Sequence, residues 1–259
     1  FHVRQIFDLS AVRRLVFSKK NHPAIIIFYQ NAFGQNTEKN IIKHLSVKQN
    51  IFFKHFNTLI IERQDCKEIL QQYFIEYDWM FKVALYGNTI DFHFLKRFSE
   101  YHIIDDQIDN ESDIFKGMGI IKGTPKPEPF TFLEGLPIVE AEQISSFYTN
   151  IDKNTSILKK EDTFLERGRF IELFRGHHIF LKKRTKEESE IVVSYTNKAC
   201  AFRDSIYSIT SSTCVRELKK IYGMLISDLS TYFQYITSSN WGVATRPEIA
   251  LEEYTAFPY

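Results

Sequence analysis

The sequence predicts an α+β protein with mixed sheet pieces and a long helix near its C-terminus. Short apolar runs separated by polar turns fill residues 1–62, which is typical of β-strands. Two further runs, 178–182 and 190–195, flank a charged turn and predict a pair of strands. Apolar residues then recur every three or four positions across 214–237, which predicts one amphipathic helix.

Within the first 62 residues we expect strands in the run HVRQIF near the start, at 24–29 and at 58–61. From Asp65 onward the spacing becomes helical, and Asp65 itself is a suitable N-cap. This change predicts two domains, 1–62 and 63–259. Because the chain opens with Phe1 directly before a strand, we also expect a further part of the protein upstream.

A second helix is expected over 90–101, and the acidic stretch 105–113 is expected to be a surface loop. Glycine and proline crowd residues 117–129 and predict another loop. No Lys-Ser/Thr follows at the nucleotide-loop spacing, which argues against a phosphate-binding loop there. Residues 211–213 offer caps for the helix at 214–237, and Pro258 excludes further helix at the end.

Composition excludes several classes of protein. With 44% hydrophobic residues the chain can bury a core, and 33 Lys+Arg against 32 Asp+Glu leave no overall field for nucleic acid. Cys66, Cys200 and Cys214 have no metal-site spacing and are odd in number, which argues against a disulfide scaffold or a zinc site. We expect a reducing cytoplasm as the location and no membrane partner, since no apolar run has the length of a membrane span.

The most basic part of the chain is Thr163–Lys186. This stretch contains only two carboxylates, Glu166 and Glu172. Its cations are Arg167, Arg169, Arg175, Lys182, Lys183, Arg184 and Lys186. The guanidinium group of an arginine can donate two hydrogen bonds to the edge of a guanine base, and lysines neutralise phosphates, so this stretch is suited to contact with duplex DNA. A solvated charged hairpin is the alternative. The tandem His177-His178 lacks a third metal ligand, and strand alternation should point its two rings to opposite faces.

Two other places could carry function. Arg203 next to Asp204 could orient a ribbon or form a structural ion pair. The turn after the long helix gathers hydroxyls, an indole and a guanidinium in Ser238, Ser239, Trp241 and Arg246, although Trp241 could instead pack on Tyr235. Catalytic motifs are missing: there is no Gly-x-Ser-x-Gly, no Asn-Pro-Pro-Tyr and no glycine-rich strand-turn-helix for S-adenosylmethionine.

Several blocks together resemble the C-terminal part of adenine-specific (N-6) DNA methyltransferases of bacterial restriction-modification systems. These blocks are VRQIFDLSAVRRLVF, HPAIIIFY, DWMFKVALYGNTIDFHFLKRF, FLERGRFIELFRGHHIFLKKR, CAFRDSIYSI and ISDLSTYFQYITSSNWGVATRPEIALEEYTAFPY. The resemblance implies that residues 1–62 end a methyltransferase domain. It implies that 63–259 form a target recognition domain like that of type I specificity subunits and fused type II enzymes.

The resemblance further implies sequence-specific recognition of duplex DNA, with the catalytic motif and the S-adenosylmethionine site in the upstream domain and no cofactor in this fragment. It leaves open whether the parent enzyme also cleaves DNA, and it allows restriction or specificity subunits as partners. By this resemblance the residues near DNA are Arg167, Arg169, Arg175, His177, His178, Lys182, Lys183, Ser238, Ser239, Trp241 and Arg246, with Arg203 added from the sequence. The unmatched stretch 122–160 is the other place where base-reading residues are expected.

Two alternatives remain at this point. The helix expected at 214–237 could pair with a helix of another subunit and make the chain a protein–protein module. A self-contained nuclease would instead use the carboxylates Asp105, Asp106, Asp109, Glu111 and Asp113.

Overall fold

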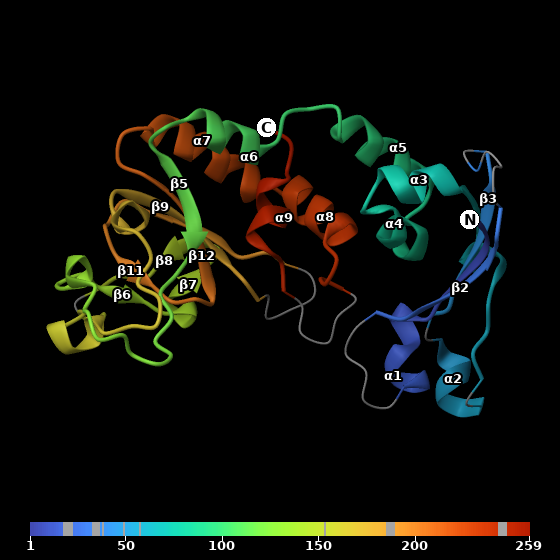
Figure 1. Ribbon diagram of the computed structural model, residues 1–259, viewed down its shortest axis with the longest axis horizontal. Coiled ribbons are helices and arrows are strands. Elements are labelled where there is room, and N and C mark those ends of the chain that lie inside the picture. The colour runs from blue at the N-terminus through green and yellow to red at the C-terminus, as the bar shows by residue number, and fades with distance from the viewer. Residues whose placement is uncertain are drawn as a thin grey trace. The chain divides into compact units, whose positions relative to one another are not determined.

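The computed structural model describes residues 1–17, 23–32, 37, 39–48, 50–56, 58–152, 154–184, 190–242 and 248–259. The chain forms two compact units (Figure 1). The first comprises Phe1–Phe98 with Tyr235–Pro247, and the second comprises Ser99–Gln234 with Glu248–Tyr259. The mixture of helix and sheet predicted from the sequence is confirmed, and the first unit extends well beyond residue 62.

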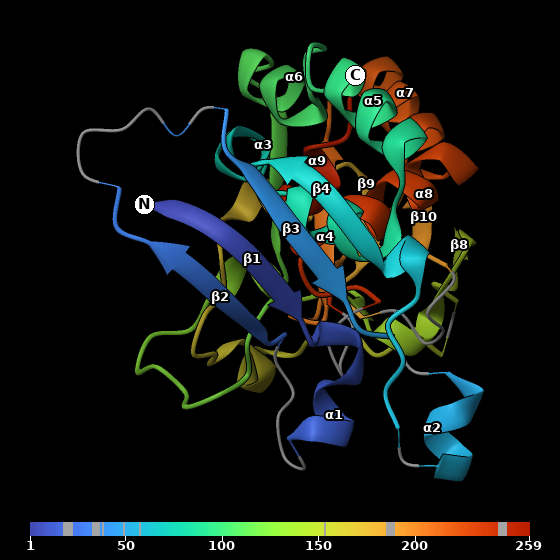
Figure 2. The ribbon, with the colours of Figure 1, turned by 90° about the vertical axis from the view of Figure 1, so that its right-hand side faces the viewer.

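A four-stranded sheet organises the first unit (Figure 2). Its order is β2-β1-β3-β4, formed by β2 (Ile25–Gln30), β1 (His2–Asp8), β3 (Ile41–Ser46) and β4 (Cys66–Leu70). The pairing of β1 with β3 is parallel, and the other two pairings are antiparallel. All six residues of the edge strand β2 are exposed, whereas β3 alternates between exposed and buried residues as a half-covered strand should.

Short helices accompany this sheet. They are α1 (Arg13–Val16), α2 (Ile51–Phe56), α3 (Gln71–Glu76), α4 (Met80–Tyr86) and α5 (Thr89–Phe98). Helix α4 contacts β3 and buries four apolar side chains, while α3 stacks the ring of Phe74 on His44 of β3 with centroids 6.1 Å apart. Burial of these apolar faces supplies most of the stabilisation of such short helices.

A six-stranded mixed sheet forms the centre of the second unit. Its order is β5-β12-β9-β10-β8-β7, formed by β5 (Ile114–Met118), β12 (Ile206–Ser211), β9 (His177–Lys182), β10 (Val193–Thr196), β8 (Phe147–Thr149) and β7 (Ile144–Ser145). The predicted strand pair 178–182 and 190–195 is confirmed as the antiparallel pair β9–β10. The small parallel pair β6 (Ile138–Val139) and β11 (Ala201–Phe202) adds Val139 and Phe202 to the same core as Phe180 of β9.

The long helix predicted over 214–237 is wrong. The chain instead forms α7 (Val215–Leu225) and α8 (Asp228–Thr237), because Ser227 both ends one helix and caps the next. Its hydroxyl donates to the carbonyl of Met224 at 2.7 Å and accepts the N–H of Ser230 at 3.1 Å. Helix α7 packs on β9, β10 and β12 and buries Leu218, Ile221 and Leu225, so its apolar stripe is covered inside its own unit.

Other expectations also change. The stretch expected as an acidic loop, 105–113, is mostly α6 (Ile104–Asn110), with the carboxylate of Asp106 accepting the N–H of Ile103 at the helix start. Residues 58–61 form no strand, and the residues just after Asp65 form β4 before α3 begins. The remaining α-helix, α9 (Leu251–Thr255), buries Tyr254 in the second unit. The hydroxyl of Tyr254 donates a hydrogen bond to the carbonyl of Lys182 at 3.0 Å.

Candidate nucleic-acid interface

The predicted basic stretch is divided between the two ends of β9. Arg175 and His177 lie at its start, whereas Lys182, Lys183 and Arg184 lie at its end. A strand rises about 3.3 Å per residue, so the two groups are roughly 17 Å apart along β9. They are two separate surfaces and are treated separately below.

A cleft of about 310 Å³ opens at the start of β9, and we call it the lysine cleft. It is lined by Tyr148, Thr149, Ile151, His177, Tyr195, Thr196, Asn197, Lys198 and Lys219. Strand β9 supplies His177, β10 supplies Tyr195, and α7 supplies Lys219. The cleft therefore combines three planar rings with two lysines at one end of the sheet.

Hydrogen bonds fix the walls of the lysine cleft. The Nδ1 atom of His177 lies 2.5 Å from the hydroxyl of Tyr195, whose ring contacts Tyr222 of α7 with centroids 5.5 Å apart. Burial raises the pKa of both tyrosines, so their hydroxyls stay protonated and neutral. Lys198 is exposed and donates to the carbonyl of Ile151 at 2.8 Å, which leaves ammonium protons for a further acceptor.

The charge of the lysine cleft is positive. Among the described residues that line it there is no Asp or Glu. A cation in a concave, partly desolvated site attracts anions more strongly than the same cation on an open surface. The cleft is thus suited to an anionic ligand that also offers flat faces to its rings.

Three other predicted arginines gather around the end of β5. Arg203 forms an isolated bridge with Ile120, and Arg167 forms one with Ile121. The Nε atom of Arg169 donates to the carbonyl of Gly119 at 3.1 Å, and that of Arg203 lies 3.4 Å from the carboxylate of Glu140. Burial, and next the charge of Arg167, lower the pKa of Arg169, while Asp204 opposes this shift. Arg169 thus binds the backbone and Arg203 pairs with a carboxylate, whereas Arg167 is the one of the three that is exposed.

The glycine-rich loop after β5 packs closely against the backbone at Phe202 and Arg203. A Cβ on Gly119 would lie 2.2 Å from the carbonyl oxygen of Phe202 and 2.3 Å from that of Arg203. The missing side chain allows two backbones to touch, so Gly119 is explained without a phosphate ligand. The loop is followed by the single 3-10 turn Thr131–Leu133 and not by an α-helix, which agrees with the sequence argument against a nucleotide site.

At the far end of β9 the cations already have a carboxylate partner. Glu248 lies 3.6 Å from the ammonium of Lys183 and 2.7 Å from Nε of Arg184. Burial raises the pKa of Glu248, but the hydrogen bond from Arg184 and the charges of Lys183 and Arg184 outweigh it and lower the pKa overall. The side chain of Lys182 is buried, with 7% of its surface exposed. Glu248 therefore offsets part of the positive charge at this end.

His178 is fully buried in the sheet and does not face solvent. Its ring stacks on Phe180 with centroids 5.2 Å apart, and its Nδ1 lies 3.1 Å from the hydroxyl of Ser208. Burial, followed by the charge of His177, lowers the pKa of His178 to about 3, so the ring is neutral near pH 7. The two histidines have separate surroundings, as strand alternation predicted, and His178 packs in the core.

The predicted turn after α8 belongs to the first unit. Ser238 and Trp241 are fully buried, and Ser239 is exposed. The expected packing of Trp241 on Tyr235 is confirmed, edge to face with centroids 5.6 Å apart. Arg246 lies outside the described residues. Buried side chains such as these shape the turn and are not available for direct contact with a duplex.

Lys82 of α4 holds this turn and was missed in the sequence. Its ammonium donates to the carbonyl of Ser238 at 2.9 Å and also to that of Trp241, and only 6% of the residue is exposed. The hydroxyl of Tyr86 adds a bond to the carbonyl of Gly242 at 3.1 Å. The sequence signal was a lysine within the buried apolar face of a helix, between Met80 and Val83.

Most of the acidic residues in 105–113 make structural contacts. Asp105 pairs with Lys116, Asp106 caps α6, and Asp113 accepts the hydroxyl of Thr213 at 2.9 Å. Across the described part of the chain, no group of three His, Cys, Asp or Glu side chains could hold a metal ion. The geometry lends no support to the nuclease alternative.

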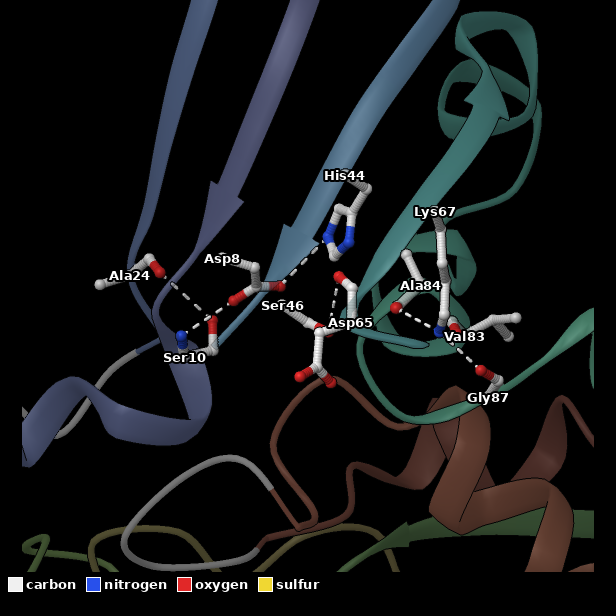
Figure 3. Close-up of polar contacts among 10 residues, drawn as sticks. All are labelled: Asp8, Ser10, Ala24, His44, Ser46, Asp65, Lys67, Val83, Ala84 and Gly87. Carbon is white, nitrogen blue, oxygen red and sulfur yellow. Dashed lines mark hydrogen bonds and ion pairs between the residues drawn. The ribbon is translucent and has the colours of Figure 1, made fainter. Parts of the chain in front are cut away.

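A buried polar cluster lies at the ends of β1 and β3 in the first unit (Figure 3). Asp8 lies 3.5 Å from Nε2 of His44 and accepts the N–H of Ser10 at 2.8 Å. Nearby, the ammonium of Lys67 binds the carbonyls of Val83, Ala84 and Gly87 at the end of α4. Burial, and next the charge of Lys48, lower the pKa of Lys67 to about 8. Asp8 and His44 are closed to solvent, so this cluster joins elements and offers no open site.

Comparison with models of known protein families finds no match to this chain, and comparison with curated proteins finds none either. No helix among the described residues is long and apolar enough to cross a bilayer.

Proposed function

We propose that this chain recognises duplex DNA for a restriction-modification adenine methyltransferase, with the second unit contacting the duplex. The observation that carries this proposal is the lysine cleft, where Lys198 and Lys219 stand beside His177 and two tyrosines with no carboxylate in the described lining. Neutralised phosphates release counterions and supply much of the affinity for DNA. Arg167 and Arg175, both exposed, are proposed as further contacts.

The exposed strand β2 supports the proposed upstream methyltransferase domain. Its apolar residues Ile25, Ile26, Ile27, Phe28 and Tyr29 are 40% to 62% exposed, and they project on both faces of an edge strand. Such a strand is an aggregation hazard unless another strand or helix covers it. We infer that the upstream domain continues this sheet past β2. In this proposal the catalytic residues and the site for S-adenosylmethionine, which donates the methyl group, lie in that domain.

The test is fluorescence anisotropy of the whole chain with a short mixed-sequence duplex at several salt concentrations. We expect affinity to fall steeply with salt, with a slope of about 0.9 per phosphate contact on logarithmic axes. The double variant Lys198→Glu/Lys219→Glu should bind far more weakly and show a shallower slope. Binding that does not depend on salt, or no binding at low salt, would overturn the proposal.

The matched control is Lys39→Glu/Lys43→Glu. Both lysines are exposed in the first unit and lie outside the lysine cleft, so this variant has the same net charge as the test variant. Near-wild-type binding by the control assigns the effect to the cleft. Equal losses in both variants would show that only overall charge matters and would contradict the assignment.

A further inference from the structure

The hairpin formed by β7 and β8 presents two aromatic residues to solvent next to the lysine cleft. Phe147 is 64% exposed and Tyr148 is 61% exposed, and Tyr148 lines the cleft. Ser145 is paired with Tyr148, so Ser146 and Phe147 form a two-residue turn. Burying a large ring is favourable, and two neighbouring rings left in water at a turn therefore need an explanation.

The backbone at Phe147 is in an unusual conformation. Its φ is 72°, in the left-handed region that glycine and asparagine adopt at low cost and that bulky residues avoid. Residues held in such regions cluster at ligand contacts, where the surrounding structure fixes them. A phenylalanine at a position suited to glycine points to a use for its ring.

Contacts with β10 hold the hairpin in place. Strand β8 pairs in parallel with β10, with Phe147 opposite Ser194 and Tyr148 opposite Tyr195. The hydroxyls of Thr149 and Ser194 are 2.6 Å apart and buried, and the hydroxyl of Ser145 donates to the carbonyl of Tyr148 at 3.3 Å. The two rings are therefore carried by a fixed backbone, which lowers the entropy lost when they bind.

The surroundings of the hairpin indicate the kind of ligand. Tyr148 shares the cleft with the rings of His177 and Tyr195 and with the ammonium groups of Lys198 and Lys219. Rings that stack on bases, set beside cations that bind the backbone, are the arrangement by which proteins hold unpaired or unstacked nucleotides. Apolar side chains can also enter a base step and unstack it.

We propose that Phe147 and Tyr148 stack on bases of the bound DNA at a step that the hairpin tip opens, while Lys198 and Lys219 hold the adjacent phosphates. This inference rests on the proposed function and adds a mode of binding to it. It also places a DNA contact within 122–160, the stretch that the family resemblance leaves unmatched.

The test compares wild type with Phe147→Gly in anisotropy titrations on a fully paired duplex and on one with a single central mismatch. A mismatch lowers the cost of opening a step, so wild type should bind the mismatched duplex more tightly. Removing one stacking ring should weaken binding by about five- to 150-fold and abolish the preference for the mismatch. Glycine suits the φ at this position, so the thermal midpoint should be unchanged or higher.

Two further variants complete the experiment. Tyr148→Ser should also weaken binding, whereas Tyr101→Ala, a control at an exposed tyrosine outside the cleft, should not. If wild type binds DNA with the expected salt dependence and Phe147→Gly binds each duplex as tightly as wild type does, this inference fails and the proposed function stands. If wild type shows no salt-dependent binding, the proposed function itself fails. If Phe147→Gly loses only self-association in light scattering, the hairpin contacts a second copy, which would also overturn the inference.

Discussion

The two ends of β9 have similar numbers of cations and differ in what those cations contact. At its start, His177 faces a cleft with Lys198 and Lys219 and no carboxylate in the described lining. At its end, Lys183 and Arg184 share the carboxylate of Glu248. The first end presents its positive charge to a ligand, whereas at the second end one carboxylate offsets part of the charge.

This difference teaches that a basic run in a sequence does not define a basic surface. Glu248 lies 64 positions after Arg184 and still contacts it, whereas the lysines of the cleft come from outside the basic run: Lys198 follows β10 and Lys219 lies in α7. The charge of a surface depends on which distant segments meet there. The three predictions below test this comparison.

The largest effect concerns the histidines at the start of β9. His178 has a pKa of about 3 in the folded protein against an ordinary 6.5, so the unfolded chain binds more protons between these values. The unfolding free energy should therefore fall as pH drops from about 6.5 to 3, by up to about 5 kcal/mol from this group. Urea unfolding at several pH values measures it. His178→Gln should lose less stability with acid than wild type, and His177→Gln should lie between the two, because it removes one of the charges that lower the pKa of His178. Identical acid profiles for all three would contradict this.

The next effect compares DNA binding at the two ends. Lys198→Ala/Lys219→Ala should weaken duplex binding by about 10- to 100-fold at low salt, because two phosphate contacts are lost. Lys183→Ala/Arg184→Ala removes the same formal charge and should change the affinity less than about threefold, since both cations are already paired with Glu248. Anisotropy titrations at matched salt give both values. The reverse ranking of the two variants would refute the comparison.

The smallest effect comes from converting the second end into one like the first. Glu248→Gln removes the shared carboxylate and should cost about 1 kcal/mol of stability or less, because Lys183 and Arg184 are partly solvent-exposed. It should also tighten duplex binding severalfold at low salt by leaving two unneutralised cations. Chemical unfolding and anisotropy on the same variant check the two outcomes. Unchanged DNA affinity would mean that this end lies away from the duplex.

Much of the fold follows from local sequence patterns. The pair β9–β10 was predicted because two apolar runs flank a polar turn, and α5 because Phe94, Leu95 and Phe98 recur at helical intervals. These signals come from short segments whose own pattern decides their structure.

Elements that depend on tertiary contacts were not predicted. In strand β3, Ile42 and His44 are both buried. The sequence does not identify His44 as a core residue, because its burial depends on contacts with Asp8 and Phe74 from distant segments. The helix break at Ser227 was hidden because apolar spacing continues through it, although the Ser-Asp pair is a capping signal.

The site divides in the same way. The sequence singled out His177, which lines the cleft, as a DNA contact. It did not single out Lys198 and Lys219, which are isolated lysines in the sequence and meet only because α7 packs on the sheet. The predicted residues His178, Lys182 and Trp241 are buried. Buried residues of this kind belong to the framework of the fold.

The hydrogen bond from Lys82 to the turn at Trp241 constrains the order in which the two units can fold during synthesis. It joins residues 159 positions apart within the first unit, which is interrupted in the chain by Ser99–Gln234. On the ribosome, residues 1–98 must wait for the whole interrupting segment to emerge before Trp241 reaches Lys82. Most residues of the second unit are therefore synthesised before the first unit can fold completely. Early folding of the second unit would shorten the flexible chain between the two segments of the first unit and so lower the entropic cost of bringing them together.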